Sequence, residues 1–176
     1  NAEDWTGVAA VFALVKELGP VMTALLFAGR AGTALTSEIG LMKATDQLSA
    51  MEMMAVNPVR RVLVPRFLGG VIAMPLLAAI FSAVGMFGAH LVGVELFQVD
   101  VGSFWQQIQL TVEMSDVNEG ILKSVVFGVA ASLIAVWEGY NTVPTAEGVG
   151  RATTRTVVIT AIAILVFDFM ITAALI

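Results

Sequence analysis

The sequence predicts an all-α, polytopic membrane protein whose helices cross the bilayer four times. Of its 176 residues, 58% are hydrophobic and only 13% are charged, and the mean hydropathy is +0.89. Soluble domains carry about a quarter charged residues, so this composition indicates a chain that lies mostly within a membrane. Four long apolar segments alternate with polar intervals, and most basic residues gather in two of those intervals. The absence of cysteine excludes disulfides and thiolate metal sites.

The first predicted span covers residues 7–29, which at ~1.5 Å per residue is long enough to cross a hydrocarbon core of about 30 Å. Lys16, Glu17, Gly19 and Pro20 interrupt it near its middle, and the proline predicts a kink there. Charges at that depth are costly unless they are paired or hydrated, and they are commonly functional. Neighbours point about 100° apart on a helix, so Lys16 and Glu17 need not pair with each other. Two interpretations stay open: a structural ion pair with another helix, or a polar patch lining a cavity for an amphiphilic or charged substrate.

The polar interval 29–66 contains an amphipathic segment, 36–58, that is expected to lie outside the membrane. Read as one helix, its apolar residues recur at steps of three and four on one face: Leu41, Ala44, Leu48, Met51 and Ala55. Thr45 is expected to cap a helix whose first turn holds Asp46 and Gln47, and Asn57 with Pro58 to end that helix and begin the next. Flexible methionines suit either a surface that stays packed while a partner moves or packing against the protein's own helices. Four lie in this segment: Met42, Met51, Met53 and Met54.

Three further spans are predicted at 67–93, 120–140 and 156–176. Pro75 is a second kink site in the first of these. The interval 94–119 is acidic and has no lysine or arginine, and Phe104 to Met114 are expected to form a short surface helix anchored by Trp105. His90 is expected to be a hydrogen-bonded helix residue rather than a metal ligand.

The distribution of charge predicts the orientation in the membrane. Seven of the nine basic residues lie in the intervals 29–66 and 141–155: Arg30, Lys43, Arg60, Arg61, Arg66, Arg151 and Arg155. By the positive-inside rule these intervals face the cytoplasm, and the acidic 94–119 segment faces the other side.

Two further features of the spans leave alternatives open. Asp168, midway along the last span, is a candidate partner for Lys16, a proton relay or a capped structural carboxylate. Small residues at four-residue spacing permit close helix approach, either within the chain or across a dimer. They are Ala24, Ala28 and Gly32.

The sequence lacks the motifs of common enzymes. It has no phosphate-binding GxxxxGK[ST] loop, no HExxH and no GxSxG, and its single histidine has no evident nucleophile beside it. We therefore predict no enzymatic activity in this chain, and any ATP hydrolysis is expected in a separate subunit.

Two blocks of sequence carry a family resemblance. The first, KELGPVMTALLFAGRAGTALTSEIGLMKATDQLSAMEMMAVNPVRRVLVPR, contains ELGP, AGRAG, EIG and MEMMAV in order, and the second is GYNTVPTAEGVGRATTRTVV. Both closely resemble the MlaE/YrbE family, permease subunits of Mla-type lipid ABC transporters in Gram-negative bacteria and plastids. That family has an additional N-terminal interfacial helix and first membrane helix that this chain lacks, so the four spans would be its second to fifth.

The resemblance implies a homodimeric permease in the inner membrane of a Gram-negative bacterium. It implies as partners a cytoplasmic ABC ATPase with a STAS-domain subunit and a periplasmic MCE-domain ring, with no role for nucleic acid. ATP and magnesium would be bound by the ATPase, and this chain would hold no cofactor. The implied substrate is glycerophospholipid, moved between the inner membrane and the periplasmic carrier to maintain outer-membrane asymmetry.

The resemblance and the sequence pattern together predict two functional regions. The lipid-binding cavity is expected to involve Lys16, Glu17, Gly19, Pro20, Arg151 and Arg155. The coupling surface for the ATPase is expected to involve Glu38, Leu41, Met42, Leu48, Met51, Glu52, Met54, Arg60 and Arg61.

The alternative function is a secondary transporter driven by an ion or proton gradient. It would use Lys16, Glu17 and Asp168 as a relay and would need no ATPase, and the lack of a detectable internal repeat counts against it. A non-transporting scaffold would leave the mid-span charges without a role, and the missing nucleophile disfavours an intramembrane enzyme.

Overall fold

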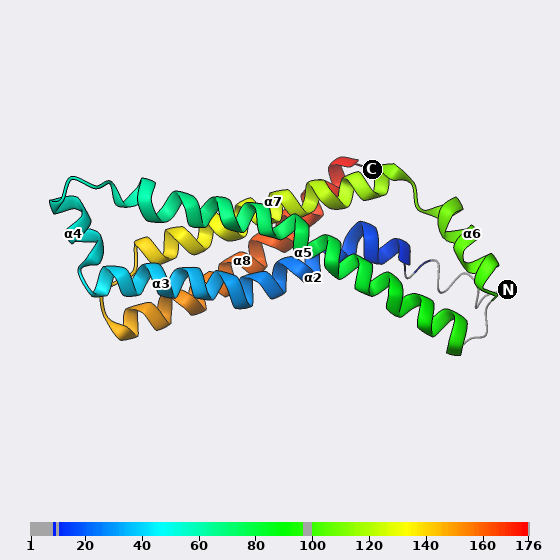
Figure 1. Cartoon of the computed structure of the whole chain (residues 1–176), viewed down its shortest axis with the longest axis horizontal. Coiled ribbons are helices and arrows are strands. Elements are labelled where there is room, and N and C mark those ends of the chain that lie inside the picture. The colour runs from blue at the N-terminus through cyan, green and yellow to red at the C-terminus, as the bar shows by residue number, and fades with distance from the viewer. Residues whose placement is uncertain (1–8, 10, 97–99, 176) are drawn as a thin grey trace.

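The computed structural model describes residue 9, residues 11–96 and residues 100–175. Every regular element in that part of the chain is a helix. Four helical stretches are long and apolar enough to cross a membrane, and they run along the long axis of the molecule (Figure 1): Val11–Ala44, Val59–Glu95, Met114–Tyr140 and Ala146–Ala174. The prediction of an all-α protein with four membrane-spanning helices is therefore confirmed.

The first long helix is irregular where the sequence predicted a kink. A π-helical turn, η1 (Leu14–Leu18), comes directly before α2 (Gly19–Phe27), and the Gly19 N–H donates to the Leu14 carbonyl. Pro20 has no N–H to donate, and the wider turn accommodates it at the start of α2. A second π turn, η2 (Ala28–Gly32), leads into α3 (Thr33–Ala44), so the helix continues 15 residues beyond the predicted end at residue 29.

The apolar residues from Leu41 to Ala55 do not lie on one helix, and that prediction was wrong. The chain turns at Asp46, whose φ of 56° is left-handed, and a short helix, α4 (Gln47–Met53), follows. Thr45 ends α3 instead of capping α4, and its hydroxyl donates to the Leu41 carbonyl at 2.9 Å. Because the helix is broken, Leu41 is 59% exposed whereas Leu48 is buried.

The second long helix begins as predicted. The Asn57 side-chain oxygen accepts from the Val59 N–H at 2.9 Å, ahead of η3 (Val59–Leu63) and α5 (Val64–His90). Pro75 lies inside α5 without ending it, and η4 (Leu91–Leu96) extends the helix.

The predicted short helix of the acidic segment is present as α6 (Val101–Thr111). Asp100 caps it by accepting from the Ser103 N–H at 3.0 Å. His90 packs against the rings of Phe104 and Trp105, with ring centroids 5.6 Å away in both cases. Among the residues that the structure describes, its buried Nδ1 atom has no hydrogen-bond partner, so the expected hydrogen bond is not found there for that atom.

The helix α7 (Met114–Tyr140) lies at the centre of the bundle, and α8 (Ala146–Leu175) packs beside it. The main core cluster joins α2, α5, α7 and α8 through Ala24, Phe27, Met74, Phe127, Ala131 and Ile164. A side chain at Gly128 would come within 2.8 Å of the Met74 Cβ, so this glycine allows α5 and α7 to approach closely. The small residues Ala24, Ala28 and Gly32 are buried within the chain, and Gly32 faces Thr156 of α8.

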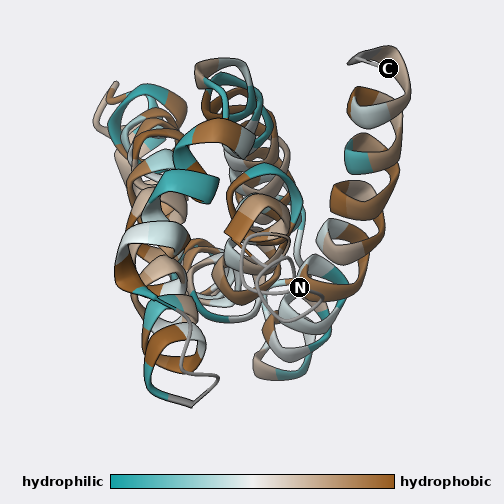
Figure 2. Cartoon of the chain, turned by 90° about the vertical axis from the view of Figure 1, so that its right-hand side faces the viewer, coloured by the Kyte–Doolittle hydropathy of each residue, from teal (hydrophilic) through white to brown (hydrophobic). Residues whose placement is uncertain are grey.

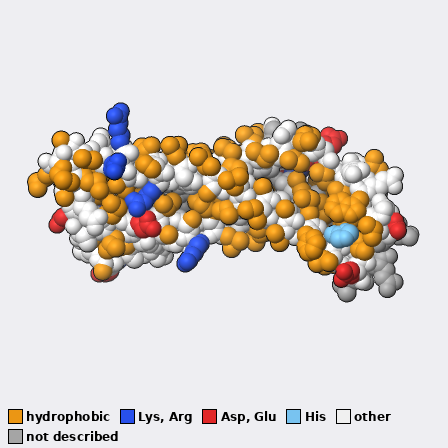
Figure 3. All heavy atoms as spheres, viewed as in Figure 1, with side chains coloured by type: hydrophobic (Ala, Val, Ile, Leu, Met, Phe, Trp, Pro, Cys, Tyr) orange, Lys and Arg blue, Asp and Glu red, His pale blue; other side chains and the backbone are white. Residues whose placement is uncertain are grey.

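Many large hydrophobic side chains are exposed on the outside of the bundle, as expected for helices in contact with lipid. Hydrophobic residues accordingly recur along the ribbons of the long helices (Figure 2). The two ends of the bundle differ in charge (Figure 3). We call the end that carries α4 and the α7–α8 loop the basic end; its cations are Lys43, Arg60, Arg61, Arg66, Arg151 and Arg155. The opposite end, with α6 and the start of α7, is the acidic end, and between them lies a mostly hydrophobic surface.

Candidate functional site: a charged cluster between three helices

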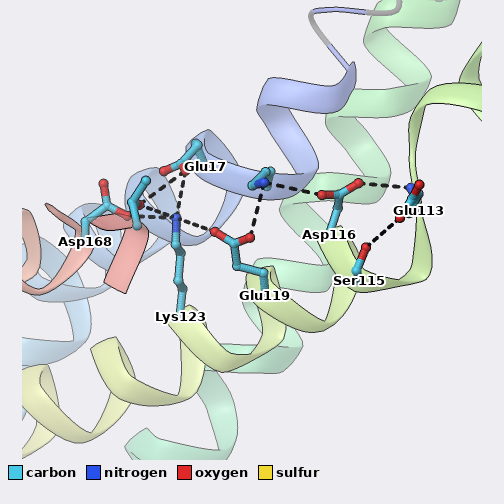
Figure 4. Close-up of polar contacts among 9 residues, drawn as sticks. Glu17, Glu113, Ser115, Asp116, Glu119, Lys123 and Asp168 are labelled. Atoms are coloured by element: carbon cyan, nitrogen blue, oxygen red, sulfur yellow. Dashed lines mark hydrogen bonds and ion pairs between the residues drawn. The ribbon is translucent and has the colours of Figure 1, made fainter. Parts of the chain in front are cut away.

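A buried lysine forms the centre of a charged cluster between the first long helix, α7 and α8 (Figure 4). The Lys123 side chain is completely buried, and its Nζ lies 2.8 Å from Glu17 Oε1. The same ammonium lies 3.3 Å from Glu119 and 3.5 Å from Asp168, and it donates to the Thr172 hydroxyl at 2.8 Å. The contacts with Glu119 and Asp168 are ion pairs without a hydrogen bond, since neither Glu119 Oε1 nor Asp168 Oδ1 has a hydrogen-bond partner among the described residues.

Lys16 forms the outer part of the cluster. Its Nζ lies 3.3 Å from Glu119 Oε2 and 3.5 Å from Asp116 Oδ1. Glu119 therefore bridges the two lysines, one through each carboxylate oxygen. The Lys16 side chain is 29% exposed and borders a surface hollow of about 510 Å³ formed with the start of α7.

Counted as charged groups, the cluster has two ammoniums and four carboxylates, an excess of two negative charges. Each lysine is already in contact with at least two carboxylates. A ligand that needs a free cation would have to compete with these carboxylates or displace one of them. The arrangement is thus suited to exchanging ion pairs when helices move, and less suited to holding an anion permanently.

Local backbone features bring these side chains together. The π turn η1 places Lys16 and Glu17 toward different partners on α7, as their spacing predicted. A side chain at Gly120 would come within 2.7 Å of the Val15 carbonyl, so only glycine allows η1 and α7 to approach this closely. The capping box between Glu113 and Asp116 fixes the start of α7 beside the cluster.

An apolar cavity of about 280 Å³ lies on the side of η1 and α2 that faces α5 and α7. Pro20 and Pro75 both line it, together with Val15 and Gly120. Gly19 faces the same side, because a side chain there would come within 2.5 Å of the Ser82 hydroxyl on α5. Two of the predicted cavity residues, Gly19 and Pro20, thus border the apolar interior and not the ion pairs of Lys16 and Lys123. Their role in lipid binding stays a prediction.

The predicted basic residues of the cavity are not brought to this cluster. Arg151 pairs with Glu147 at 2.6 Å, and Arg155 lies 3.4 Å from Glu138 of α7, both at the basic end. Along α8, Arg151 is 17 residues from Asp168, which corresponds to about 25 Å. Asp168 pairs with Lys123, so the alternative in which it is the partner of Lys16 was wrong.

The predicted coupling residues gather at the basic end but differ in exposure. Arg66 pairs with Glu38 at 3.0 Å and donates to the Met42 sulfur at 3.4 Å, which ties the start of α5 to α3. Leu48 and Met51 are buried or partly buried, whereas Glu52, Arg60 and Arg61 are exposed. The methionines divide in the same way: Met53 and Met54 are 86% and 68% exposed.

The residue that the sequence interpretation missed is Lys123. It lies three residues inside a predicted span, and only its spacing from Glu119 signals a role, because residues four apart share a helix face. Its burial and its contacts with three helices depend on the packing of the bundle.

Comparison with known proteins identifies the family. Residues 1–174 match the family described as Permease MlaE. The chain belongs to the MlaE permease family. The predicted resemblance is therefore confirmed over almost the whole chain.

Relatives in this family share the full extent of the chain. It is 55% identical to the intermembrane phospholipid transport system permease protein MlaE of Haemophilus influenzae, over 98% of this chain and 67% of that protein. It is 35% identical to a probable ABC transporter permease protein of Rickettsia typhi, over 99% of this chain and 68% of the relative. A chloroplastic protein of Arabidopsis thaliana, TRIGALACTOSYLDIACYLGLYCEROL 1, is 29% identical over 95% of this chain and 47% of its own length.

Proposed function

We propose that this chain is the membrane-embedded part of a phospholipid ABC permease, and that it moves glycerophospholipids between the inner membrane of a Gram-negative bacterium and a periplasmic MCE-type carrier. The observation that carries the proposal is the 55% identity, over 98% of the chain, to a permease named for intermembrane phospholipid transport. The four apolar helices and the charged cluster are consistent with a transport path for an amphiphile. We further propose that the chain acts as a homodimer, with a STAS-domain subunit attached to the ATPase.

The energy for transport would come from a separate ATPase at the basic end, where cofactor ATP and magnesium would bind in that partner. Two features support this site. Met53 and Met54 are exposed on the corner formed by α4, and flexible thioethers suit a surface that must follow a moving partner. Arg60 and Arg61 follow a few residues later in the chain and are exposed, and by the positive-inside rule this end faces the cytoplasm.

Coupling would then pass along α3 and α5 to the charged cluster. Arg66 links α5 to Glu38 of α3, and the Lys43 ammonium donates to the Tyr140 carbonyl at 2.7 Å at the end of α7. A displacement of α4 would therefore shift three of the four long helices together. At the far end, relative movement of η1 and α7 would exchange ion pairs of Lys16 and Glu17 and so change the access of a lipid to the apolar interior.

Reconstituted vesicles test both halves of this proposal with separate variants. In full-length complex, Lys16→Gln with Glu17→Gln should lower phospholipid transfer to acceptor carrier at least fivefold while the ATPase still co-purifies, because the ion pairs are lost but the basic end is intact. Replacing Met53 and Met54 by aspartate should instead release the ATPase. The matched control is Leu110→Asp, an equally exposed apolar residue on α6 at the acidic end, which should leave ATPase binding unchanged.

Two results would count against the proposal. Normal lipid transfer by the double glutamine variant would remove the cluster from the transport path. Transport that needs a proton gradient and continues without any ATPase would favour the secondary transporter, with Asp168 and Lys123 as the groups to examine next.

A further inference from the structure

The surface hollow beside Lys16 combines both signs of charge. It has a volume of about 510 Å³ and lies between the first long helix and the start of α7. Its lining residues are Lys16, Ser115, Asp116, Asn118, Glu119 and Leu122. One ammonium meets two carboxylates there, so the charged groups of the lining sum to a single negative charge. The hollow therefore offers partners to a cation as well as to an anion.

The hollow lies at the depth of lipid headgroups. The helix α7 has 27 residues and is thus about 40 Å long, which matches a bilayer together with its headgroup regions. Ser115 and Glu119 are the second and sixth residues of α7, so the polar lining falls within about 8 Å of the acidic end of that helix. Headgroup regions occupy roughly the outer 5–8 Å on each side of the hydrocarbon core. Leu122, about one turn deeper, is 50% exposed and offers apolar contact to the chains below a headgroup.

An anion alone can bind Lys16 only by displacing its present partners. The ammonium lies 3.3 Å from Glu119 and 3.5 Å from Asp116, and both carboxylates point from α7 toward the first long helix (Figure 4). Their side chains are only 11% and 12% exposed, so water compensates them poorly. Without Lys16, Glu119 keeps Lys123, whereas Asp116 has no other cation within 4 Å among the described residues. A phosphate at Lys16 would therefore leave Asp116 without a counter-charge, which is costly for a largely buried carboxylate.

A ligand that carries its own cation beside the phosphate removes this cost. The headgroup of phosphatidylethanolamine joins a phosphate to an ammonium through a short ethylene linker. It can give the phosphate to Lys16 and its N–H donors to Asp116 and Glu119, so every charged group keeps a partner of opposite sign. An anionic headgroup such as that of phosphatidylglycerol supplies the phosphate only and adds to the negative charge of the hollow.

We infer that this hollow selects the zwitterionic headgroup of an aminophospholipid over anionic headgroups, with the phosphate at Lys16 and the ammonium at Asp116 and Glu119. The inference rests on the proposed function, because it names the headgroup of the transported lipid. Asp116 is the specificity-determining residue. Among the described residues it is not a partner of Lys123, so its substitution leaves the centre of the charged cluster in place.

Transfer of two lipids from the same vesicles tests the selection. The full-length complex is reconstituted in vesicles of equal parts phosphatidylethanolamine and phosphatidylglycerol, with a trace of either lipid carrying a fluorescent acyl chain. ATP-dependent transfer of each labelled lipid to the acceptor carrier is then measured. We expect wild type to transfer phosphatidylethanolamine about tenfold faster, because loss of a charge-assisted contact lowers affinity by about that factor. Equal rates for the two lipids would overturn the inference.

A matched pair of variants separates the hollow from the general charge of the acidic end. Asp116→Asn removes a charge but keeps an oxygen that can accept from the Glu113 N–H. It should lower the ratio of the two transfer rates about threefold, since Glu119 stays as the second carboxylate. Glu95→Gln removes an exposed carboxylate at the same end that does not line the hollow, and it should leave the ratio unchanged. An unchanged ratio in Asp116→Asn, or an equal decrease in both variants, would overturn the inference.

Two further readings of the same assay identify the source of the ligand and separate the two proposals. Glycerophosphoethanolamine carries the same headgroup without acyl chains, and an excess of it should leave transfer unchanged. Inhibition would assign the hollow to a soluble ligand and overturn the inference. ATP-dependent transfer of both lipids at equal rates overturns only the headgroup selection, whereas the absence of ATP-dependent transfer of either lipid overturns the proposed function and the selection with it.

Discussion

Replacing Lys123 by methionine should destabilise the protein strongly, because it removes the ammonium around which the charged cluster is built. The variant keeps an unbranched side chain of similar length, so it leaves the volume nearly unchanged and removes the charge. Glu17, Glu119 and Asp168 then lose their shared counter-ion, and only Glu119 retains another, through Lys16.

The size of the effect follows from the geometry. At an effective dielectric constant of about 20, the 2.8 Å contact with Glu17 alone corresponds to ~6 kcal/mol before desolvation is subtracted. Desolvation offsets much of this, and removing one partner of a buried ion pair costs about 3–5 kcal/mol. The Glu17 side chain is 35% exposed and can partly rehydrate, so we expect a loss of about 3 kcal/mol.

Thermal unfolding of the detergent-solubilised protein measures this loss. A protein of this size shifts its Tm by about 2–4 °C per kcal/mol, so Lys123→Met should unfold about 6–12 °C below wild type. The matched control is Lys16→Met, whose side chain is 29% exposed and should cost no more than about 1 kcal/mol. Adding Glu17→Gln to Lys123→Met should recover part of the loss, because it removes an uncompensated carboxylate. Equal Tm values for Lys123→Met and wild type would refute the reasoning.

Three further substitutions test the packing and the caps in the same unfolding assay. Gly128→Ala places a methyl group 2.8 Å from a side-chain carbon of α5 and should lower the free energy of unfolding by about 1–3 kcal/mol. Its control is Gly69→Ala, whose added methyl group meets no atom within 4 Å and should be neutral or stabilising. Equal effects of the two variants would contradict the close packing of α5 and α7. Asn57→Ala should lower the free energy of unfolding by about 1 kcal/mol, because it removes the cap of the second long helix. Asn57→Ser keeps a capping oxygen and should be closer to wild type in stability. Equal stability of the alanine and serine variants would show that the cap contributes little. Thr36→Val should lower the free energy of unfolding by about 1–2 kcal/mol, because the Thr36 hydroxyl donates to the Ala135 carbonyl at 3.0 Å and bonds to the Thr156 hydroxyl at 2.8 Å. Thr36→Ser keeps a hydroxyl that can make both hydrogen bonds and serves as the control. Equal stability of the two variants would argue against these hydrogen bonds.

Most of the fold could be predicted because membrane helices must satisfy every backbone hydrogen bond internally and must be apolar along their length. These two requirements are visible in composition and hydropathy alone. Local signals were equally readable where they act over a few residues: Asn57 caps its helix, and the irregular turn lies beside Pro20. The family blocks were recognisable for the same reason, since they are continuous stretches of sequence.

The wrong predictions concern positions where the backbone departs from a single periodicity. The face from Leu41 to Ala55 assumed one helix, but the left-handed Asp46 breaks it and rotates the two parts relative to each other. A helical repeat of three and four residues continues across such a break in the sequence, so periodicity could not reveal it. Asp168 was a candidate partner for Lys16 because both lie near mid-span, but depth in the membrane does not say which helix face a side chain occupies.

The sequence by itself determined the class of this protein, its four apolar helices, the unequal charge of its two ends and its membership of the MlaE permease family, because each depends on composition or on contiguous residues. Only the tertiary structure decided which charges meet. Lys123 is paired with Glu17 and Asp168, 106 and 45 residues away in the chain. Such contacts depend on the rotation and close approach of whole helices, which glycines and π turns set at a few positions and which hydropathy does not record.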